Sequence, residues 1–100
     1  MTIDIKKNGQ EVTLTIAGRL DTLTAPALDK VVNDEAHGAS GIIMDMKELE
    51  YISSAGLRVL LGAHKKMQKA GFLRLTNVGE SVMEVLEMTG FSDILEIDWH

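Results

Sequence analysis

Two adjacent serines, Ser53 and Ser54, are the residues of this sequence with the clearest capacity for chemistry. They lie in the stretch EYISSAGLRVLL (50–61), between an apolar run and a segment with helical spacing. Serine is a preferred N-cap residue, because its hydroxyl accepts a hydrogen bond from a free N–H of the first turn, which is worth about 1 kcal/mol over alanine. One cap needs only one serine. The second hydroxyl is then available to a kinase, since Ala55 and Gly56 leave the opening turn sterically open.

A phosphate at this helix start would change the surface more than the fold. It would add about −1.5 to −2 charges near the positive end of the helix dipole, which stabilises anions. A docked partner, in contrast, would meet a new dianion and be repelled. The residues alone leave both interpretations open, a structural cap and a modified hydroxyl.

Catalytic and metal sites find no support in the residue pattern. A hydrolase nucleophile on a strand-to-helix turn needs glycine two residues before and after it, and neither serine has both. The histidines share no spacing suited to a catalytic base or a metal ligand set; they are His37, His64 and His100. Neither GxxxxGK[ST] nor GxGxxG is present. The sequence therefore predicts no enzyme activity, no metal and no cofactor.

Composition indicates one domain over residues 1–100. The chain is 45% apolar and 25% charged, which is typical of a compact domain. Its net charge of −5 argues against direct binding of nucleic acid. It has no cysteine, no secretory leader pattern and no stretch near the roughly 18 apolar residues that span a bilayer. We expect a cytoplasmic protein without membrane insertion.

The periodicity of apolar residues predicts five strands and three helices. Period-2 alternation around Asn8-Gly9 predicts a hairpin, and three further strands are expected at 41–46, 72–76 and 93–97. Helical spacing predicts helices that begin near Thr24, Ser54 and Ser81 and end at Gly38, Gly71 and Gly90. Thr24 is expected to cap the first helix, and Ser81 to form a capping box with Glu84. Five methionines have core-like spacing, namely Met44, Met46, Met67, Met83 and Met88.

The order β-β-α-β-α-β-α-β predicts an α/β fold with a mixed, mainly parallel sheet and helices packed against it. In such a sheet the loops after parallel strands converge on one edge. Asp21 follows one expected strand and Asp45 lies near the end of another, so they are expected to form an acidic rim around the serines. Each also has a simpler interpretation: Asp21 caps the first helix, and Asp45 points to solvent or hydrogen-bonds a neighbouring loop.

Three segments together resemble the STAS domain of bacterial anti-sigma factor antagonists: GRLDTLTAP, GIIMDMKELEYISSAGLRVLLGAHKKMQKAG and GFSDILEI. The resemblance covers nearly the whole chain. It implies a partner-switching cycle, in which the unmodified domain binds an anti-sigma factor that is also a serine kinase and so frees a sigma factor. Phosphorylation of one serine breaks this complex, and a PP2C-type phosphatase resets it. The domain is then a kinase substrate and binding module, with a monomer as the expected state.

The family pattern commonly reads Asp-Ser-x-Gly-Leu. Aligning Gly56 and Leu57 with it puts Ser54 at the acceptor position and Ser53 where aspartate often stands, with Ser53 as the alternative acceptor. The partner-binding face implied by the resemblance comprises Asp21, Thr22, Asp45, Ser53, Ser54, Ala55, Gly56, Leu57 and Arg58. Two other functions remain open: a STAS module of a transporter or lipid-trafficking complex that is never phosphorylated, and a nucleotide-binding regulator, for which no motif is present.

Overall fold

The computed structural model describes residues 1–98. Along the chain it contains β1 (Thr2–Asn8), β2 (Glu11–Leu20), α1 (Ala25–Glu35), β3 (Gly41–Asp45), β4 (Leu49–Ile52), α2 (Ser54–Ala70), β5 (Phe72–Thr76), α3 (Glu80–Met88), a 3₁₀ turn (Phe91–Asp93) and β6 (Glu96–Asp98).

The strands form one mixed sheet in the order β1-β2-β3-β5-β6. β1 and β2 pair antiparallel through a tight turn in which Gly9 has φ +64°, a conformation that glycine adopts without steric conflict. The other pairs are parallel. The predicted α/β fold with a mixed, mainly parallel sheet is therefore confirmed.

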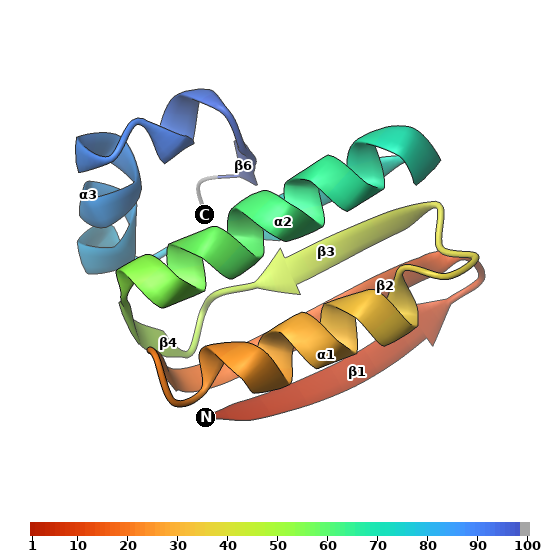
Figure 1. The fold of residues 1–100 in the computed structure, drawn as a ribbon, viewed down its shortest axis with the longest axis horizontal. Helices are drawn as coiled ribbons and strands as arrows, with labels where there is room; N and C mark the ends of the chain where they lie inside the picture. The colour runs from red at the N-terminus through yellow and green to blue at the C-terminus, as the bar shows by residue number, and fades with distance from the viewer. Residues whose placement is uncertain (99–100) are drawn as a thin grey trace.

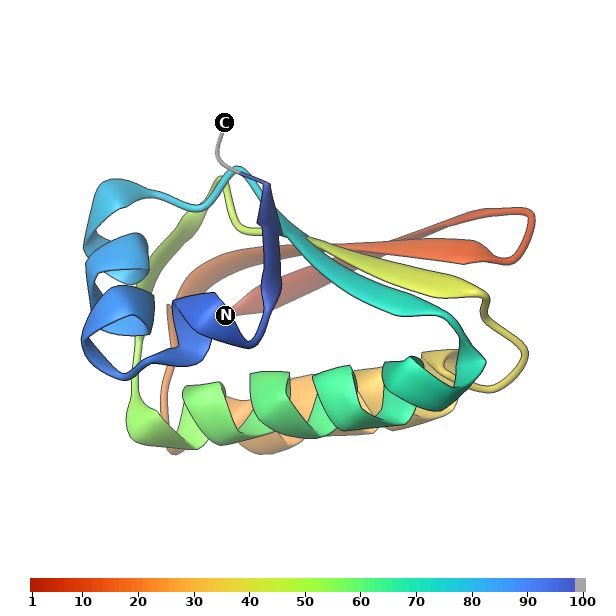
Figure 2. The same ribbon diagram turned by 90° about the horizontal axis from the view of Figure 1, so that it is seen from above.

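Helices α1 and α2 lie side by side on the same face of the sheet, and α3 packs against β4 at one end (Figures 1 and 2). The core fills the space between the sheet and these helices. Its fully buried side chains come from every layer and include Leu14, Ile16, Leu28, Val32, Ile42, Met44, Met46, Leu60, Met67, Leu75 and Leu86. Burial of these aliphatic side chains is the main source of stability.

One methionine departs from the predicted core. Met44, Met46, Met67 and Met83 are buried as expected, but the side chain of Met88 is 81% exposed. The buried side of α3 is formed by Val82, Met83 and Leu86. Because Met88 is two residues beyond Leu86, it lies on the opposite side of the helix.

Residues 49–52 form a strand, although the sequence pattern placed them in the connection to the helix at Ser54. This strand, β4, pairs with the last part of β2 beyond a shift of register between Gly18 and Arg19. β4 therefore lies beyond the end of β3 on the same edge of β2, and it adds no further strand to the order of the sheet. Its burial pattern is buried, exposed, exposed, buried, which is not the alternation of a period-2 strand and explains why the sequence did not reveal it.

The C-terminal elements also differ in detail from the prediction. The last strand begins at Glu96 instead of residue 93, because the left-handed Gly90 leads into a 3₁₀ turn first. Helix α3 begins at Glu80, with Gly79 as the N-cap residue and no side-chain capping bond. The predicted capping box is therefore wrong, since Ser81 already lies inside the helix.

Candidate functional site

The two serines at the start of α2 have different structural positions. Ser53 is the N-cap residue in extended conformation, and its hydroxyl oxygen accepts from the Gly56 N–H at 3.5 Å, which is long for a hydrogen bond. The Ser53 N–H donates to the Leu20 carbonyl at 2.9 Å. Ser54 is the first helical residue and is exposed. Ser53 thus serves as the cap, which leaves an accessible hydroxyl on Ser54.

Gly56 and Leu57 fix the position of the start of α2 on the side that faces the core. A Cβ atom on Gly56 would lie 2.7 Å from Leu20 Cγ and 2.9 Å from Ile52 Cγ1, so only glycine lets the first turn approach β2 and β4 this closely. The Leu57 side chain is 7% exposed. Both residues were expected on the partner-binding face, and in this structure both are buried against the core.

The loop before α1 is held by a reciprocal set of hydrogen bonds. One Asp21 carboxylate oxygen accepts from the Leu23 N–H at 3.0 Å and the Thr24 N–H at 3.1 Å. The Asp21 N–H donates to the Thr24 hydroxyl oxygen at 2.9 Å, and that hydroxyl donates to the Arg19 carbonyl at 2.8 Å. The loop is therefore rigid. The Asp21 carboxylate closes the loop and does not cap α1 as expected, because Leu23 and Thr24 both precede the first helical residue, Ala25. The side chain of Thr24 likewise ties the loop to β2 instead of capping α1.

The pKa of the Asp21 carboxyl lies below its ordinary value. Partial burial alone would raise it, but the hydrogen bonds from Thr24 and Leu23, together with the charge of Arg19, have the larger combined effect. Arg19 Nε lies 3.9 Å from Asp21 Oδ2, and its guanidinium stacks over the Tyr51 ring at 4.2 Å from the centroid. Asp21 is consequently a fixed negative charge at neutral pH.

A shallow cavity of about 360 Å³ lies between the starts of α1 and α2. It is lined by Thr22, Ala25, Pro26, Asp29, Ala55, Arg58 and Val59. Three of the expected partner-binding residues therefore meet here: Thr22 from the loop before α1, and Ala55 and Arg58 from α2. Asp21 adjoins Thr22 in the chain, and the residue before it, Leu20, accepts the hydrogen bond from the Ser53 N–H.

Asp45 does not belong to this cluster. It pairs with Thr15 across the sheet, whereas Ile52 pairs with Leu20, five residues further along β2 and therefore roughly 16 Å away. The Asp45 carboxylate accepts from the Lys47 N–H and from the Asn77 amide, each at 3.0 Å. The predicted acidic rim is wrong because β4 intervenes between Asp45 and the serines. The alternative, a hydrogen bond to a neighbouring loop, is confirmed.

Two exposed apolar side chains near the helix starts were not among the predicted site residues. Leu23 is 89% exposed in the rigid loop before α1, and Tyr51 is 42% exposed on β4. The sequence signal for Leu23 was a leucine in a turn of polar residues, outside any helical or strand periodicity. We give the name serine face to the exposed residues around this helix start together with the half-buried Asp21: Arg19, Asp21, Thr22, Leu23, Tyr51, Ser54 and Arg58.

Within residues 1–98, no group of three or more acidic or histidine side chains is placed to hold a metal ion. In that same part of the chain, no helix combines the length and apolar character needed to cross a bilayer.

The comparisons with known proteins agree with this fold. The family model of the STAS domain matches residues 2–99, and the chain belongs to this family. The anti-sigma-B factor antagonist of Bacillus subtilis (strain 168) is 31% identical over 98 residues, covering 97% of this chain and 90% of that protein.

Solved structures give the same result. A putative anti-sigma factor antagonist from Thermotoga maritima superimposes with a TM-score of 0.88 at 28% identity, covering 95% of this chain and 84% of that one. The Bacillus cell fate determinant SpoIIAA in its phosphorylated form has a TM-score of 0.76 at 17% identity, with coverage of 97% and 91%, and so shares the fold.

Proposed function

We propose that this protein is an anti-sigma factor antagonist whose unphosphorylated form binds an anti-sigma factor serine kinase and frees a sigma factor. Phosphorylation of Ser54 ends this binding, and a PP2C-type serine phosphatase restores it. Relatives that carry the antagonist name support the class of function. We choose Ser54 as the phosphate acceptor because the two serines differ in position: Ser53 is the helix cap, and Ser54 is exposed on the first turn.

The surroundings of Ser54 suit a phosphate. The free N–H groups at the start of α2 favour an anion by about 0.3–1 kcal/mol. Arg58 lies four residues further along the helix, hence on the same side, and is exposed. A dianion at Ser54 is therefore compatible with the folded domain, in agreement with a phosphorylated STAS domain having been solved in SpoIIAA.

The switch acts on the bound partner through charge. Moving a complex from 99% bound to 99% free requires about 5.5 kcal/mol of differential affinity. Two like unit charges 5 Å apart at an effective dielectric constant of 20 repel by roughly 3 kcal/mol. A dianion that faces a single carboxylate of a docked partner reaches the required size, and the fixed charge of Asp21 beside it adds to the negative field.

The acceptor assignment is tested by incubating the protein with its kinase and ATP and measuring intact mass, followed by fragmentation to locate the phosphate. We expect one phosphate on Ser54. Ser54→Ala should accept none, and Ser53→Ala should still be phosphorylated, because its hydroxyl is not the acceptor. A phosphate found on Ser53 would overturn the assignment, and partner binding that ignores the state of Ser54 would favour a STAS module that is not switched by phosphate.

A further inference from the structure

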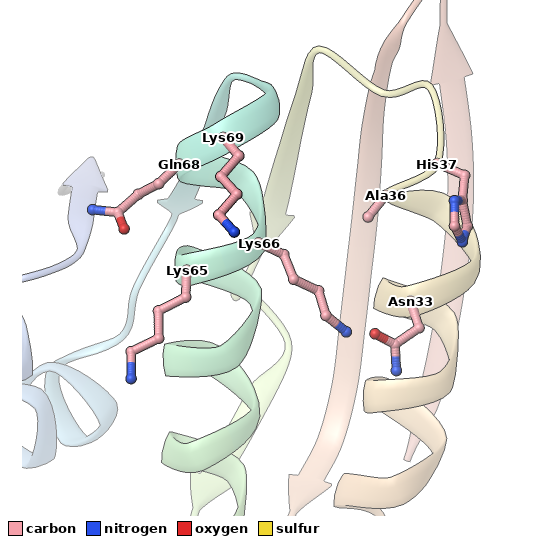
Figure 3. A pocket seen from close by; sticks show the side chains of 7 residues that line it. All are labelled: Asn33, Ala36, His37, Lys65, Lys66, Gln68 and Lys69. Carbon is pink, nitrogen blue, oxygen red and sulfur yellow. The ribbon is translucent and has the colours of Figure 1, made fainter.

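A second feature of the α1/α2 layer lies at its other end, where both helices finish. Here an open groove of about 840 Å³ is lined by Asn33, Ala36, His37, Lys65, Lys66, Gln68 and Lys69, which we call the lysine groove. Figure 3 shows the Lys66 side chain extending from α2 toward α1, on which Asn33 lies. The groove contains no acidic residue, although the chain as a whole has a net charge of −5.

The neighbouring carboxylates are engaged elsewhere. Asp34 pairs with Lys30 at 2.9 Å, and Glu35 pairs with Lys7 of β1 at 3.1 Å. Within residues 1–98, no carboxylate lies within ion-pair distance of Lys65, Lys66 or Lys69. The lysines therefore form a concentrated positive field on an acidic protein.

Stabilisation of the helix end accounts for only part of this charge. Cations near a helix C-terminus interact favourably with the dipole, but the effect is confined to the last turn. Lys69 lies in the last turn of α2, whereas Lys65 and Lys66 precede it.

We propose that the lysine groove binds an acidic segment of a partner protein. Three alternatives fit less well. A membrane surface requires exposed apolar side chains beside the lysines, and the exposed large apolar residues Ile5, Leu23, Tyr51, Met88 and Ile94 all lie outside the groove. Single-stranded nucleic acid favours aromatic stacking platforms, which the groove lacks.

A small molecule would need a site that encloses most of its surface, whereas this groove is open to solvent. An extended acidic chain, in contrast, needs only exposed ammonium groups within its reach. Lys66 extends toward α1, and Lys65 extends from the other side of α2 (Figure 3).

The lysine groove works independently of Ser54. Lys69 lies 15 residues along α2 from Ser54, which corresponds to roughly 22 Å. The Debye length at physiological ionic strength is about 8 Å, so a phosphate on Ser54 is screened from the groove. A partner held at the lysine groove can therefore remain bound through both states of the serine face.

The test uses a fluorescently labelled short polyglutamate peptide and measures anisotropy at low and physiological ionic strength. Lys66→Glu/Lys69→Glu should weaken binding about tenfold or more, because two attractive pairs become repulsive. The matched control is Lys6→Glu/Lys47→Glu, which changes the net charge equally at exposed lysines outside the groove. The control and Ser54→Asp should bind like the unmodified protein, and salt should weaken all binding.

Lys66→Gln/Lys69→Gln removes the charges without placing carboxylates near the helix end, and it should also lose binding while keeping the thermal unfolding midpoint. Equal weakening by the groove and control variants, or no saturable binding at low salt, would overturn the proposal. Binding to vesicles of phosphatidylglycerol and phosphatidylcholine in preference to the peptide would overturn the assignment to a protein partner. None of these results bears on phosphorylation of Ser54.

Discussion

Replacing Gly56 by alanine tests how closely the start of α2 must approach the sheet. The added methyl group would lie 2.7 Å from Leu20 Cγ and 2.9 Å from Ile52 Cγ1. Neither atom is at the flexible end of its side chain, and both residues are buried. Overpacking of this kind costs about 1–3 kcal/mol. Alanine in place of glycine gains up to about 1 kcal/mol in a helix interior, and less in its first turn.

The expected result is a net loss of about 1–2 kcal/mol in the free energy of unfolding. Gly62→Ala provides the matched control, because Gly62 lies in the same helix and a Cβ there would have no atom within 4 Å. This control should gain about 0.5–1 kcal/mol. Urea denaturation followed by circular dichroism measures both. If the two variants were stabilised alike, the close approach of α2 to Leu20 and Ile52 would not be a constraint, and our explanation of Gly56 would be wrong.

Three further predictions concern the serine face. Leu23→Asp should abolish binding of the anti-sigma factor kinase in calorimetry without lowering stability, since Leu23 is 89% exposed. The control Met88→Asp, at a position on α3 that is 81% exposed, should bind normally. Equal binding by the two variants would show that Leu23 is not part of the interface. Ser53→Ala should lose about 0.5–1 kcal/mol of unfolding free energy because a weak cap is removed, and Ser54→Ala should change it by less than about 0.5 kcal/mol. If urea denaturation showed the larger loss for Ser54→Ala, Ser54 would be the cap instead of Ser53. The pKa of Asp21 in the folded state is lowered from 3.8, so its contribution to stability is complete above pH 3.8 and is lost as the pH falls through the lower folded-state pKa. The melting temperature of Asp21→Asn should therefore depend less on acid than that of the unmodified protein. An equal acid dependence of the two proteins would contradict this role of Asp21.

Much of the fold was predictable because local signals and packing agree. The Asn8-Gly9 turn, the helix start after Ser53 and the left-handed Gly38 and Gly90 each have a sequence pattern with one structural meaning. The short strands were less visible. β4 has four residues and β6 has three, which is too few for a period to be read.

Asp45 was wrongly predicted to lie beside the serines because β4 was not predicted from the sequence. Without β4, the end of β3 and the start of α2 were expected at one edge of the sheet, and Asp45 beside the serines. Local chemistry was enough to indicate a serine cap at the start of α2, a role that Ser53 has. It did not predict that the Asp21 carboxylate would bind the loop N–H groups of Leu23 and Thr24 instead of capping α1. The exposure of Leu23 depends on how the loop is tied to β2 by Thr24, which no local pattern predicts.

The most direct test of the switch compares the affinity of the anti-sigma factor kinase for the unmodified protein and for the protein carrying phosphoserine at position 54, incorporated during synthesis and measured by isothermal titration calorimetry. The account predicts tight binding of the unmodified form and a loss of about 10⁴-fold on phosphorylation. Equal affinity of the two forms would contradict it.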